Sequence, residues 1–245
     1  MSTSTNNSDR KLFRHALANC SAALLLAASA SAMSIEAGQW SVRAGLTNVN
    51  PDASSDPLAL NGSRSAFVDA VGPETLDVDD STQLGLTVEY HVTADWGIEL
   101  LAASPFDHSA EGTKTFNGVE LVDTKQLPPT LSAIYHFNNG SPVTPYVGLG
   151  LNYTVFFEED TTGAADGAFA GLGLTGADVS VDSSWGTSVQ AGFDVDINDN
   201  IMVNFSARWI DIDTEVDITF DGGTKITTDL EIDPMVYSLL LGYRL

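Results

Sequence analysis

The sequence predicts an all-β protein, an eight-stranded antiparallel up-and-down transmembrane β-barrel. Three observations support this fold class. Eight runs of residues alternate between apolar and polar side chains, as strands do when one face meets lipid and the other meets a lumen. The connections alternate between short turns and long loops, and aromatic residues gather at the ends of the runs. Both features are typical of outer-membrane barrels.

The N-terminal segment has the features of a secretory signal peptide. Arg10 and Lys11 precede an apolar run at 22–28, and Ala30-Ser31-Ala32 supplies the small residues of a cleavage site. We therefore expect residues 1–32 to be a signal peptide and residues 33–245 to form the barrel, exported through the inner membrane to the outer membrane of a Gram-negative cell. The sole cysteine, Cys20, lies in this signal segment, so we expect no disulfide in the exported part.

The period-two pattern gives the expected strands and their faces. The expected runs are 40–47, 83–92, 96–102, 127–137, 143–157, 184–196, 201–212 and 234–245. In the first run Trp40 and Leu46 would face lipid, whereas Arg43 would face the lumen. An even number of strands brings both ends of the barrel to the periplasm, and closure satisfies the edge hydrogen bonds that lipid cannot satisfy.

The connections assign the two ends of the barrel. Short turns are expected at 93–95, 138–142 and 197–200, and long loops at 48–81, 104–124, 158–183 and 213–233. The first long loop is rich in Asp, Ser and Gly and is expected to be mobile, while a short helix is expected near 164–172. The chain carries a formal net charge of −23, which argues against a nucleic-acid partner. We interpret the acidic residues of the long loops as a solvated surface. Alternatively, they gather divalent cations that bridge to lipopolysaccharide, or they are an adaptation to a salty habitat.

Sorting the lumen-facing residues by depth predicts an apolar funnel above a charged floor. The funnel residues are Leu101, Phe156, Ile210, Ile212 and Val236. The floor residues are Arg43, Glu89, Glu99, Asp194, Arg208 and Arg244, with His91 nearby. Such a floor would block straight passage, so we hypothesise a lateral exit near Pro105, Pro128 and Pro129, because proline cannot donate to a strand ladder. Alternatively, these prolines only end the pairing above the membrane and the floor is an ordinary barrel interior.

Enzyme and cofactor motifs do not fit this framework. The Gly171–Gly176 stretch matches a dinucleotide fingerprint in spacing, but it lies in a long loop without a βαβ context. The stretch that begins at Asp194 lacks the glycine and the final Glu of a calcium loop. A barrel acyltransferase or lipase would have to use His108 with Ser104, Ser109 or Asp107. We therefore expect neither an enzyme nor a cofactor or metal site.

Several motifs, in order along the chain, resemble the outer membrane protein W family. They include the ten residues from Gly97 to Phe106, the stretch 127–131, the ten residues from Pro145 to Thr154, and 241–244. The resemblance implies a narrow channel with an apolar lumen for passive uptake of small hydrophobic solutes, alkanes in some relatives, while a colicin uses one member as its receptor. The alternative is a non-transporting surface barrel that acts as a structural protein, an adhesin, or a colicin or phage receptor.

The expected partners follow from this setting. They are the outer-membrane lipids and lipopolysaccharide, the hydrophobic solute, and the barrel assembly machinery.

The last residue departs from the usual pattern of such barrels. The last run ends at Leu245, whereas such barrels usually end in Phe as part of the signal for assembly.

Overall fold

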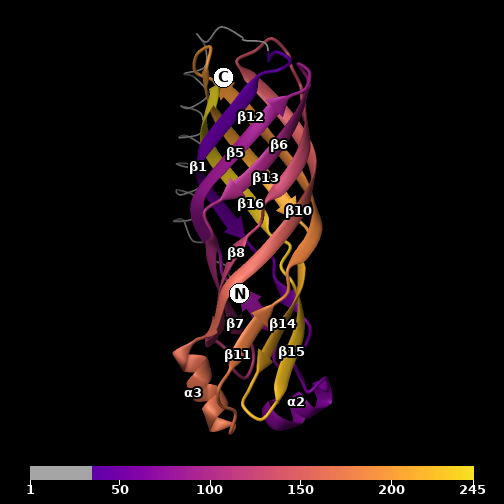
Figure 1. The fold of residues 1–245 in the computed structure, drawn as a ribbon, viewed down its shortest axis with the longest axis vertical. Helices are drawn as coiled ribbons and strands as arrows, with labels where there is room; N and C mark the ends of the chain where they lie inside the picture. Colours follow the sequence, from indigo (N-terminus) through magenta and orange to yellow (C-terminus); the bar gives the residue numbers. More distant parts are fainter. Residues whose placement is uncertain (1–34) are drawn as a thin grey trace, which may run out of the picture.

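The computed structural model describes residues 35–245 and contains a closed eight-stranded antiparallel barrel (Figure 1). The barrel strands are β1 (Trp40–Asn50), β5 (Ser81–His91), β6 (Trp96–Ala103), β9 (Thr130–His136), β10 (Val143–Thr161), β12 (Ser184–Asp196), β13 (Ile201–Ile210) and β16 (Met235–Arg244). Each pairs with its neighbour along the chain, and β1 pairs with β16 to close the barrel. The predicted fold class is confirmed, whereas the predicted signal peptide lies outside the described residues.

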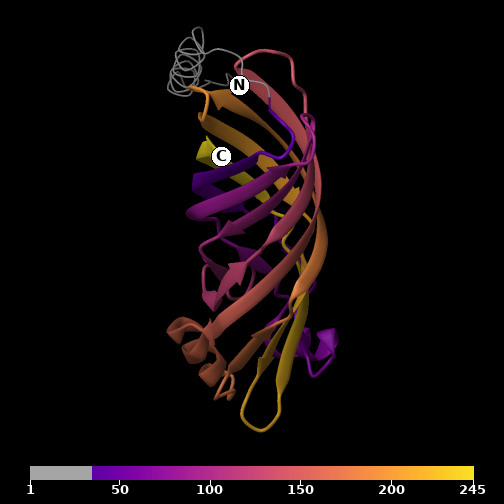
Figure 2. The same ribbon diagram turned by 45° about the horizontal axis from the view of Figure 1, so that its top comes forward.

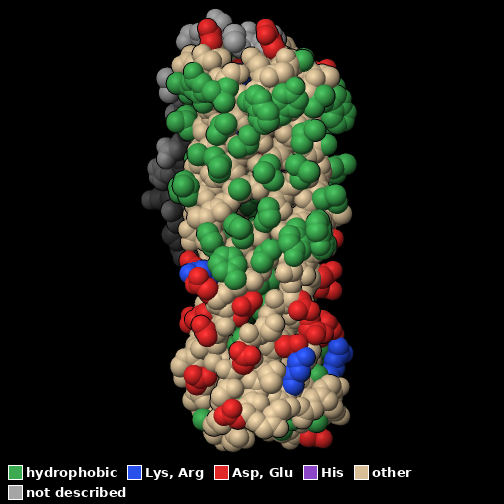
Figure 3. Space-filling view, in the orientation of Figure 1, with side chains coloured by type: hydrophobic (Ala, Val, Ile, Leu, Met, Phe, Trp, Pro, Cys, Tyr) green, Lys and Arg blue, Asp and Glu red, His purple; other side chains and the backbone are tan. Residues whose placement is uncertain are grey.

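The two faces of the strands separate by polarity as the alternation predicts. Leu46, Leu149 and Leu241 point outward, with 63%, 68% and 61% of their surface exposed, whereas Arg43 and Thr47 are buried in the lumen. Apolar side chains cover the outside of the barrel in Figure 3, and acidic side chains gather beyond it. This division matches a wall surrounded by lipid. Among residues 35–245, no helix is long and apolar enough to span a bilayer.

Aromatic pairs mark the two ends of this apolar belt. At the end with the short turns, the ring centroids of Trp40 and Tyr90 lie 4.9 Å apart, and Trp96 contacts Tyr135 at 5.0 Å. At the other end, Tyr153 and Trp185 lie 4.5 Å apart. Tyr and Trp favour the two membrane–water interfaces. The pairs therefore mark the two membrane–water interfaces, and the short turns assign the first of these to the periplasmic side, as is usual in outer-membrane barrels.

The four long connections are not simple loops, and this corrects the sequence-based expectation. They contain β4 (Leu76–Val78), β7 (Phe106–Gly112) and β8 (Glu120–Leu127), and a second sheet of β11 (Asp178–Val181), β14 (Asp213–Thr219), β15 (Lys225–Glu231), β2 (Ser54–Ser55) and β3 (Ala59–Leu60). Two short helices, α2 (Arg64–Val71) and α3 (Gly163–Gly171), complete this outer extension, seen at the bottom of Figure 1. The helix expected near 164–172 is confirmed by α3.

The outer extension is held together by its own apolar core. Phe116 packs edge to face on Phe169, which in turn packs on Phe220. The first long connection, expected to be mobile, contributes α2, whose Phe67 is buried and whose N-terminus is capped by the Ser63 hydroxyl. Figure 2 shows how β10 runs from the barrel into this extension without a break. The barrel therefore ends in a packed cap at its outer end.

An arginine at the middle of the apolar belt tests the assignment of the lipid face. Leu149→Arg should lower the free energy of unfolding by about 2–4 kcal/mol, the cost of a lipid-facing Arg near the bilayer midplane. The matched control is Leu172→Arg, because Leu172 follows α3 in the outer extension and is 45% exposed. Urea unfolding in lipid vesicles measures both variants. Equal effects of the two substitutions would contradict the assignment.

Candidate channel lumen

Arg43 forms the centre of the charged floor. From β1 it reaches three carboxylates: Nη2 lies 2.8 Å from Glu89 Oε2 and 2.9 Å from Asp194 Oδ2, and Nη1 lies 3.3 Å from Glu99 Oε2. All four side chains are buried. A buried guanidinium is stable only when its charge is compensated and its donors are used. The three acids supply that compensation from β5, β6 and β12.

A second guanidinium extends the network towards the middle of the barrel. Arg208 Nη2 lies 2.7 Å from Glu99 Oε1, and Arg208 Nε donates to Gln190 Oε1 at 3.0 Å. Gln190 in turn donates to Glu99 Oε1 at 3.1 Å. The structure thus joins five of the six predicted floor residues in one network. The sixth, Arg244, instead pairs with Asp196 at 2.7 Å.

Sequence reasoning missed several members of the floor. His136 Nε2 lies 2.6 Å from Glu89 Oε1, and Asn204 donates both to Asp194 at 2.8 Å and to the Tyr146 hydroxyl at 3.0 Å. All three fall on the lumen face of their strands, so the alternation carried the signal, but only arginines, acids and His91 were counted with the floor. Together with the ion pairs they fill the periplasmic half of the barrel.

Glycine makes room for this network in a barrel of only eight strands. A Cβ added at Gly97 would lie 2.0 Å from Glu89 Oε1, and one at Gly242 would lie 2.9 Å from Arg43 Cγ. Small barrels have an interior just wide enough for their side chains. The glycines on β6 and β16 therefore provide the space that the large charged side chains occupy.

Above the floor, the lumen is lined by small uncharged polar groups. The Thr47 and Ser238 hydroxyls lie 2.9 Å apart, and Asn152 donates to Thr130 at 3.0 Å. Leu101 lies at this level, because it is opposite Thr87 on one side and Thr130 on the other. Apolar side chains therefore do not line the whole lumen. The structure shows an uncharged polar layer between the floor and the outer end.

The other four predicted funnel residues belong to the apolar core of the outer end. Phe156, Ile210, Ile212 and Val236 are all buried in one cluster with the core of the extension. Cavities between these layers are small: one of about 30 Å³ lies beside Phe156, His108 and Gln126, and another of about 10 Å³ lies deeper in the extension. Neither is much larger than a single water molecule. The predicted funnel is therefore closely packed in this conformation.

His108 is part of this packed region. Its Nδ1 donates to the Asp79 carbonyl oxygen at 2.9 Å, and its Nε2 lies 2.9 Å from Gln126 Nε2. Burial lowers the pKa of His108 below its ordinary value of 6.5. The Ser109 hydroxyl, which an acyl-transfer reaction would need near this ring, instead donates to Asp123 at 2.8 Å. His108 is therefore placed as a packed core residue.

The predicted gate prolines lie at an interruption of the barrel wall. The β6–β9 ladder ends at Leu101 opposite Thr130, and the β7–β8 ladder begins at Phe106 opposite Gln126. Residues 102–105 and 127–129, which include Pro105, Pro128 and Pro129, lie between the two ladders. We call this interval the wall break. The Tyr153 N–H donates to the Pro129 carbonyl oxygen at 3.1 Å, so the wall break lies at the level of the outer aromatic belt.

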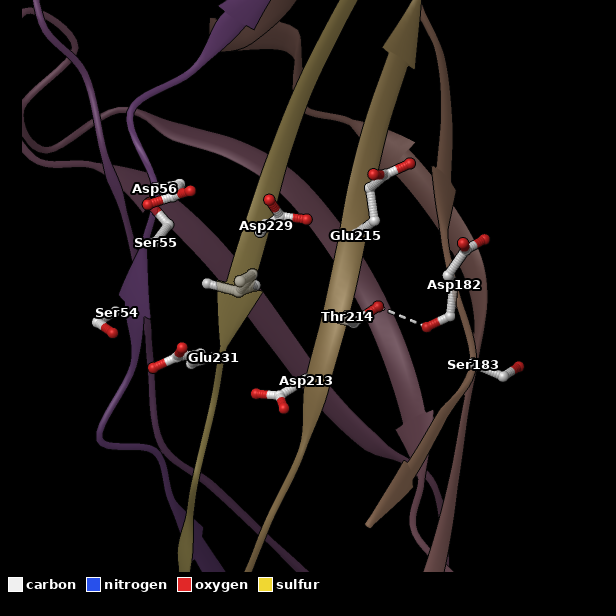
Figure 4. A pocket seen from close by; sticks show the side chains of 11 residues that line it. Ser54, Ser55, Asp56, Asp182, Ser183, Asp213, Thr214, Glu215, Asp229 and Glu231 are labelled. Atoms are coloured by element: carbon white, nitrogen blue, oxygen red, sulfur yellow. Dashed lines mark hydrogen bonds between the residues drawn. The ribbon is translucent and has the colours of Figure 1, made fainter.

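A separate groove of about 780 Å³ lies on the outer extension rather than in the barrel. Figure 4 shows carboxylates from β14, β15 and the segments beside them along this groove. They belong to Asp56, Asp182, Asp213, Glu215, Asp229 and Glu231. Such a surface is strongly solvated and suits water or cations rather than an apolar solute.

A closed eight-stranded barrel with a lipid-facing belt and an ion-paired lumen defines an outer-membrane β-barrel protein. The chain belongs to the OmpW family, whose model matches residues 36–245. It is 37% identical over 230 residues to outer membrane protein W of Vibrio cholerae, covering 92% of this chain and 97% of that protein.

Two further relatives extend the comparison. The crystal structure of the outer membrane protein OprG from Pseudomonas aeruginosa superposes with a TM-score of 0.76 at 35% identity, covering 86% of this chain and 97% of that chain. The dibenzothiophene metabolism operon protein PahQ of Pseudomonas aeruginosa is 25% identical over 207 residues, covering 84% of this chain and 89% of that protein. The predicted family and outer-membrane location are confirmed by these matches.

Removal of the Arg43 guanidinium should lower the free energy of unfolding of the barrel. Arg43→Met leaves three buried carboxylates without their shared partner, and loss of one member of a buried ion pair costs about 3–5 kcal/mol. The control is Arg64→Met, because the Arg64–Asp56 pair is exposed and such pairs contribute less than about 1 kcal/mol. Urea unfolding of both variants in vesicles gives the comparison. A loss below 1 kcal/mol for Arg43→Met would contradict the central role of this residue.

Proposed function

We propose that the protein mediates passive uptake of small hydrophobic molecules across the outer membrane, with lateral release into the bilayer. The observation that carries this proposal is the order of the lumen lining. Apolar residues such as Phe156 and Ile212 fill the outer end, uncharged polar residues follow, and ion pairs around Arg43 close the periplasmic end. The wall break lies between the apolar end and the floor.

The outer end supplies the favourable step for an apolar solute. Transfer from water to apolar surroundings gains roughly 25 cal/mol per Å² of buried apolar surface. Because the cavities at this end measure only about 30 and 10 Å³, the solute must separate side chains of the packed core as it enters. We therefore expect uptake to depend on opening of the cap. The name of the dibenzothiophene operon relative, which refers to an apolar aromatic compound, agrees with a hydrophobic solute.

The floor favours lateral release over axial passage. An apolar molecule that crossed the floor would have to break the contacts of Arg43 and Arg208 with their carboxylates, and an unpaired buried ion costs several kcal/mol. At the wall break, by contrast, the backbone ladder is already interrupted and the prolines contribute no N–H donors. The lipid outside is as apolar as the solute, so release there requires no rehydration.

The second candidate function is a surface barrel that transports nothing. The close packing of the outer end favours it, because a plugged barrel needs no passage. Such a protein would act through its outer extension as a structural protein, an adhesin, or a colicin or phage receptor. Measurement of uptake separates the two functions.

A charge placed in the apolar and middle layers should block the solute. Leu101→Arg and Phe156→Arg are each expected to slow uptake of a medium-chain alkane into vesicles at least about tenfold, which corresponds to roughly 1.4 kcal/mol in the barrier. Leu172→Arg, on the outside of the extension, is the control for the added charge. Heat-modifiable gel mobility verifies that each variant is a folded barrel.

Uptake of a small sugar is measured beside the alkane. Unchanged alkane uptake in both folded lumen variants would contradict the hydrophobic route. If the unaltered protein sped up neither solute, the non-transporting alternative would hold instead.

A disulfide across the wall break tests lateral release. Extended into the wall break, the registers of the two ladders place Ser104 opposite residue 127 or 128. Because residue 128 is a proline, Ser104→Cys is combined with Leu127→Cys, which is expected to tie the two edges together. Oxidation is expected to slow alkane uptake and reduction to restore it. The matched control is Leu100→Cys with Leu131→Cys, a directly paired position in the intact ladder. Equal rates for the oxidised and reduced wall-break variant would rule out this exit and leave the uptake function standing.

A further inference from the structure

Three potential metal ligands meet at the periplasmic end of the floor. Glu89 and His91 project into the lumen from alternate positions of β5, and His136 projects from the end of β9. Their nearest ligand atoms all lie within 4.8 Å of one another. Strand β6 runs between them and carries Gly97, so that no side chain separates the three groups. The strand order therefore brings two imidazoles and a carboxylate together at the periplasmic end of the lumen.

The nitrogen of His91 that faces this point has no partner within the described chain. His91 is 1% exposed, its Nε2 lies 2.8 Å from the Ser41 hydroxyl, and its Nδ1 makes no hydrogen bond. That Nδ1 lies 3.7 Å from Glu89 Oε1. A buried polar atom without a partner is costly and normally indicates a missing ligand, water or ion. With Nε2 protonated towards Ser41, Nδ1 offers a free lone pair.

The charge of the floor also points to a cation. Among the described residues buried in the barrel lumen, the guanidinium groups of Arg43, Arg208 and Arg244 face four carboxylates, those of Glu89, Glu99, Asp194 and Asp196. Counting the arginines and the acids, this cluster carries one excess negative charge. Uncompensated charge in a low-dielectric interior is expensive. The two histidines beside Glu89 mark where a compensating cation would be held.

We propose that Glu89, His91 and His136 form a binding site for a divalent transition-metal ion of the Zn²⁺ class. Two imidazole nitrogens and one carboxylate oxygen are a ligand set that suits Zn²⁺, Cu²⁺ or Ni²⁺ rather than Ca²⁺ or Mg²⁺. Ligands bound at about 2.0–2.1 Å in a tetrahedral site lie roughly 3.4 Å from one another. The Glu89 Oε1 to His136 Nε2 distance of 2.6 Å would therefore lengthen, and His91 would move inward.

The surroundings hold these ligands in place. Arg43 binds Glu89 through Oε2, the oxygen that the metal would not use, and the Ser41 hydroxyl fixes the His91 ring. Such outer contacts orient metal ligands and tune their basicity. Because His91 and His136 end their strands beside the periplasmic turns, the ion would enter from the periplasm. Once bound, it would link β5 to β9 across β6 and neutralise the floor.

Metal titration of the refolded, untagged barrel tests the site. The protein contains three histidines after residue 34, His91, His108 and His136, which gives a matched set of variants. Isothermal titration with Zn²⁺ in detergent micelles at pH 7.5 is expected to show one equivalent bound, and Co²⁺ should give the visible absorption of a site with nitrogen ligands. His91→Ala and His136→Ala should each weaken binding at least tenfold, while His108→Gln should bind as the unaltered protein does.

A second measurement covers variants that do not refold. The thermal unfolding midpoint of the unaltered barrel should rise with Zn²⁺ and return with a chelator, because an ion that binds only the folded state stabilises it. The rise should exceed that with Ca²⁺, which the acidic groove of the outer extension can also bind. Absence of one-equivalent binding to the unaltered protein, or binding that both the His91 and His136 variants retain, would overturn the proposal. Neither outcome bears on the uptake route, which is measured separately.

Discussion

The pairing of Arg43 with Glu89, Glu99 and Asp194 is the constraint on which the barrel interior depends. Eight strands enclose a lumen only wide enough for side chains, so a guanidinium at its centre cannot be hydrated and must be compensated by carboxylates. These acids come from β5, β6 and β12. Glycine at 97 and 242 follows from the same constraint, because a side chain there would occupy the space of Glu89 or Arg43.

The closed floor gives the outer end a different physical role. Strand β10 passes without interruption from the barrel into the extension, pairing first with β9 and then with β8. The wall break is the place where this change of partner occurs. Between it and the cap, the packing consists of apolar side chains such as Phe156 and Ile210, which can separate and close again without leaving a charge unpaired. The floor is thus held together by ion pairs, whereas the outer end is held together by apolar packing.

The sequence alone was sufficient for the barrel and partly sufficient for its interior. Period-two alternation identified all eight barrel strands, and the boundaries 184–196 coincide with β12, because a lipid-facing and a lumen-facing side chain differ strongly in polarity. The outer extension was missed. There Val216 and Ile226 face a protein core while their neighbours are more exposed, and the strands are only seven residues long. Because these segments are also rich in Asp, Thr and Gly, the sequence predicted loops.

Residue type predicted which side chains belong to the floor, but it did not predict which of them pair with one another. Arg244 was grouped with Arg43, yet it pairs with Asp196, because partnership depends on the stagger between strands and the alternation does not contain that stagger. His136 and Gln190 were missed for the opposite reason: alternation placed them on the lumen face, but only the register shows that they touch Glu89 and Glu99.

The order of polarity along the barrel axis determines the direction of the proposed transport. For an apolar solute the free energy falls in the outer core, rises beside hydroxyls such as those of Thr47 and Ser238, and rises further at the ion pairs of Arg43. An apolar floor would instead retain the solute at the periplasmic end, since leaving it would require hydration. On the proposed route, with a charged floor, the nearest region of low free energy would be the bilayer outside the wall break. The same ion pairs that stabilise the barrel would therefore direct an apolar solute sideways, with no input of energy.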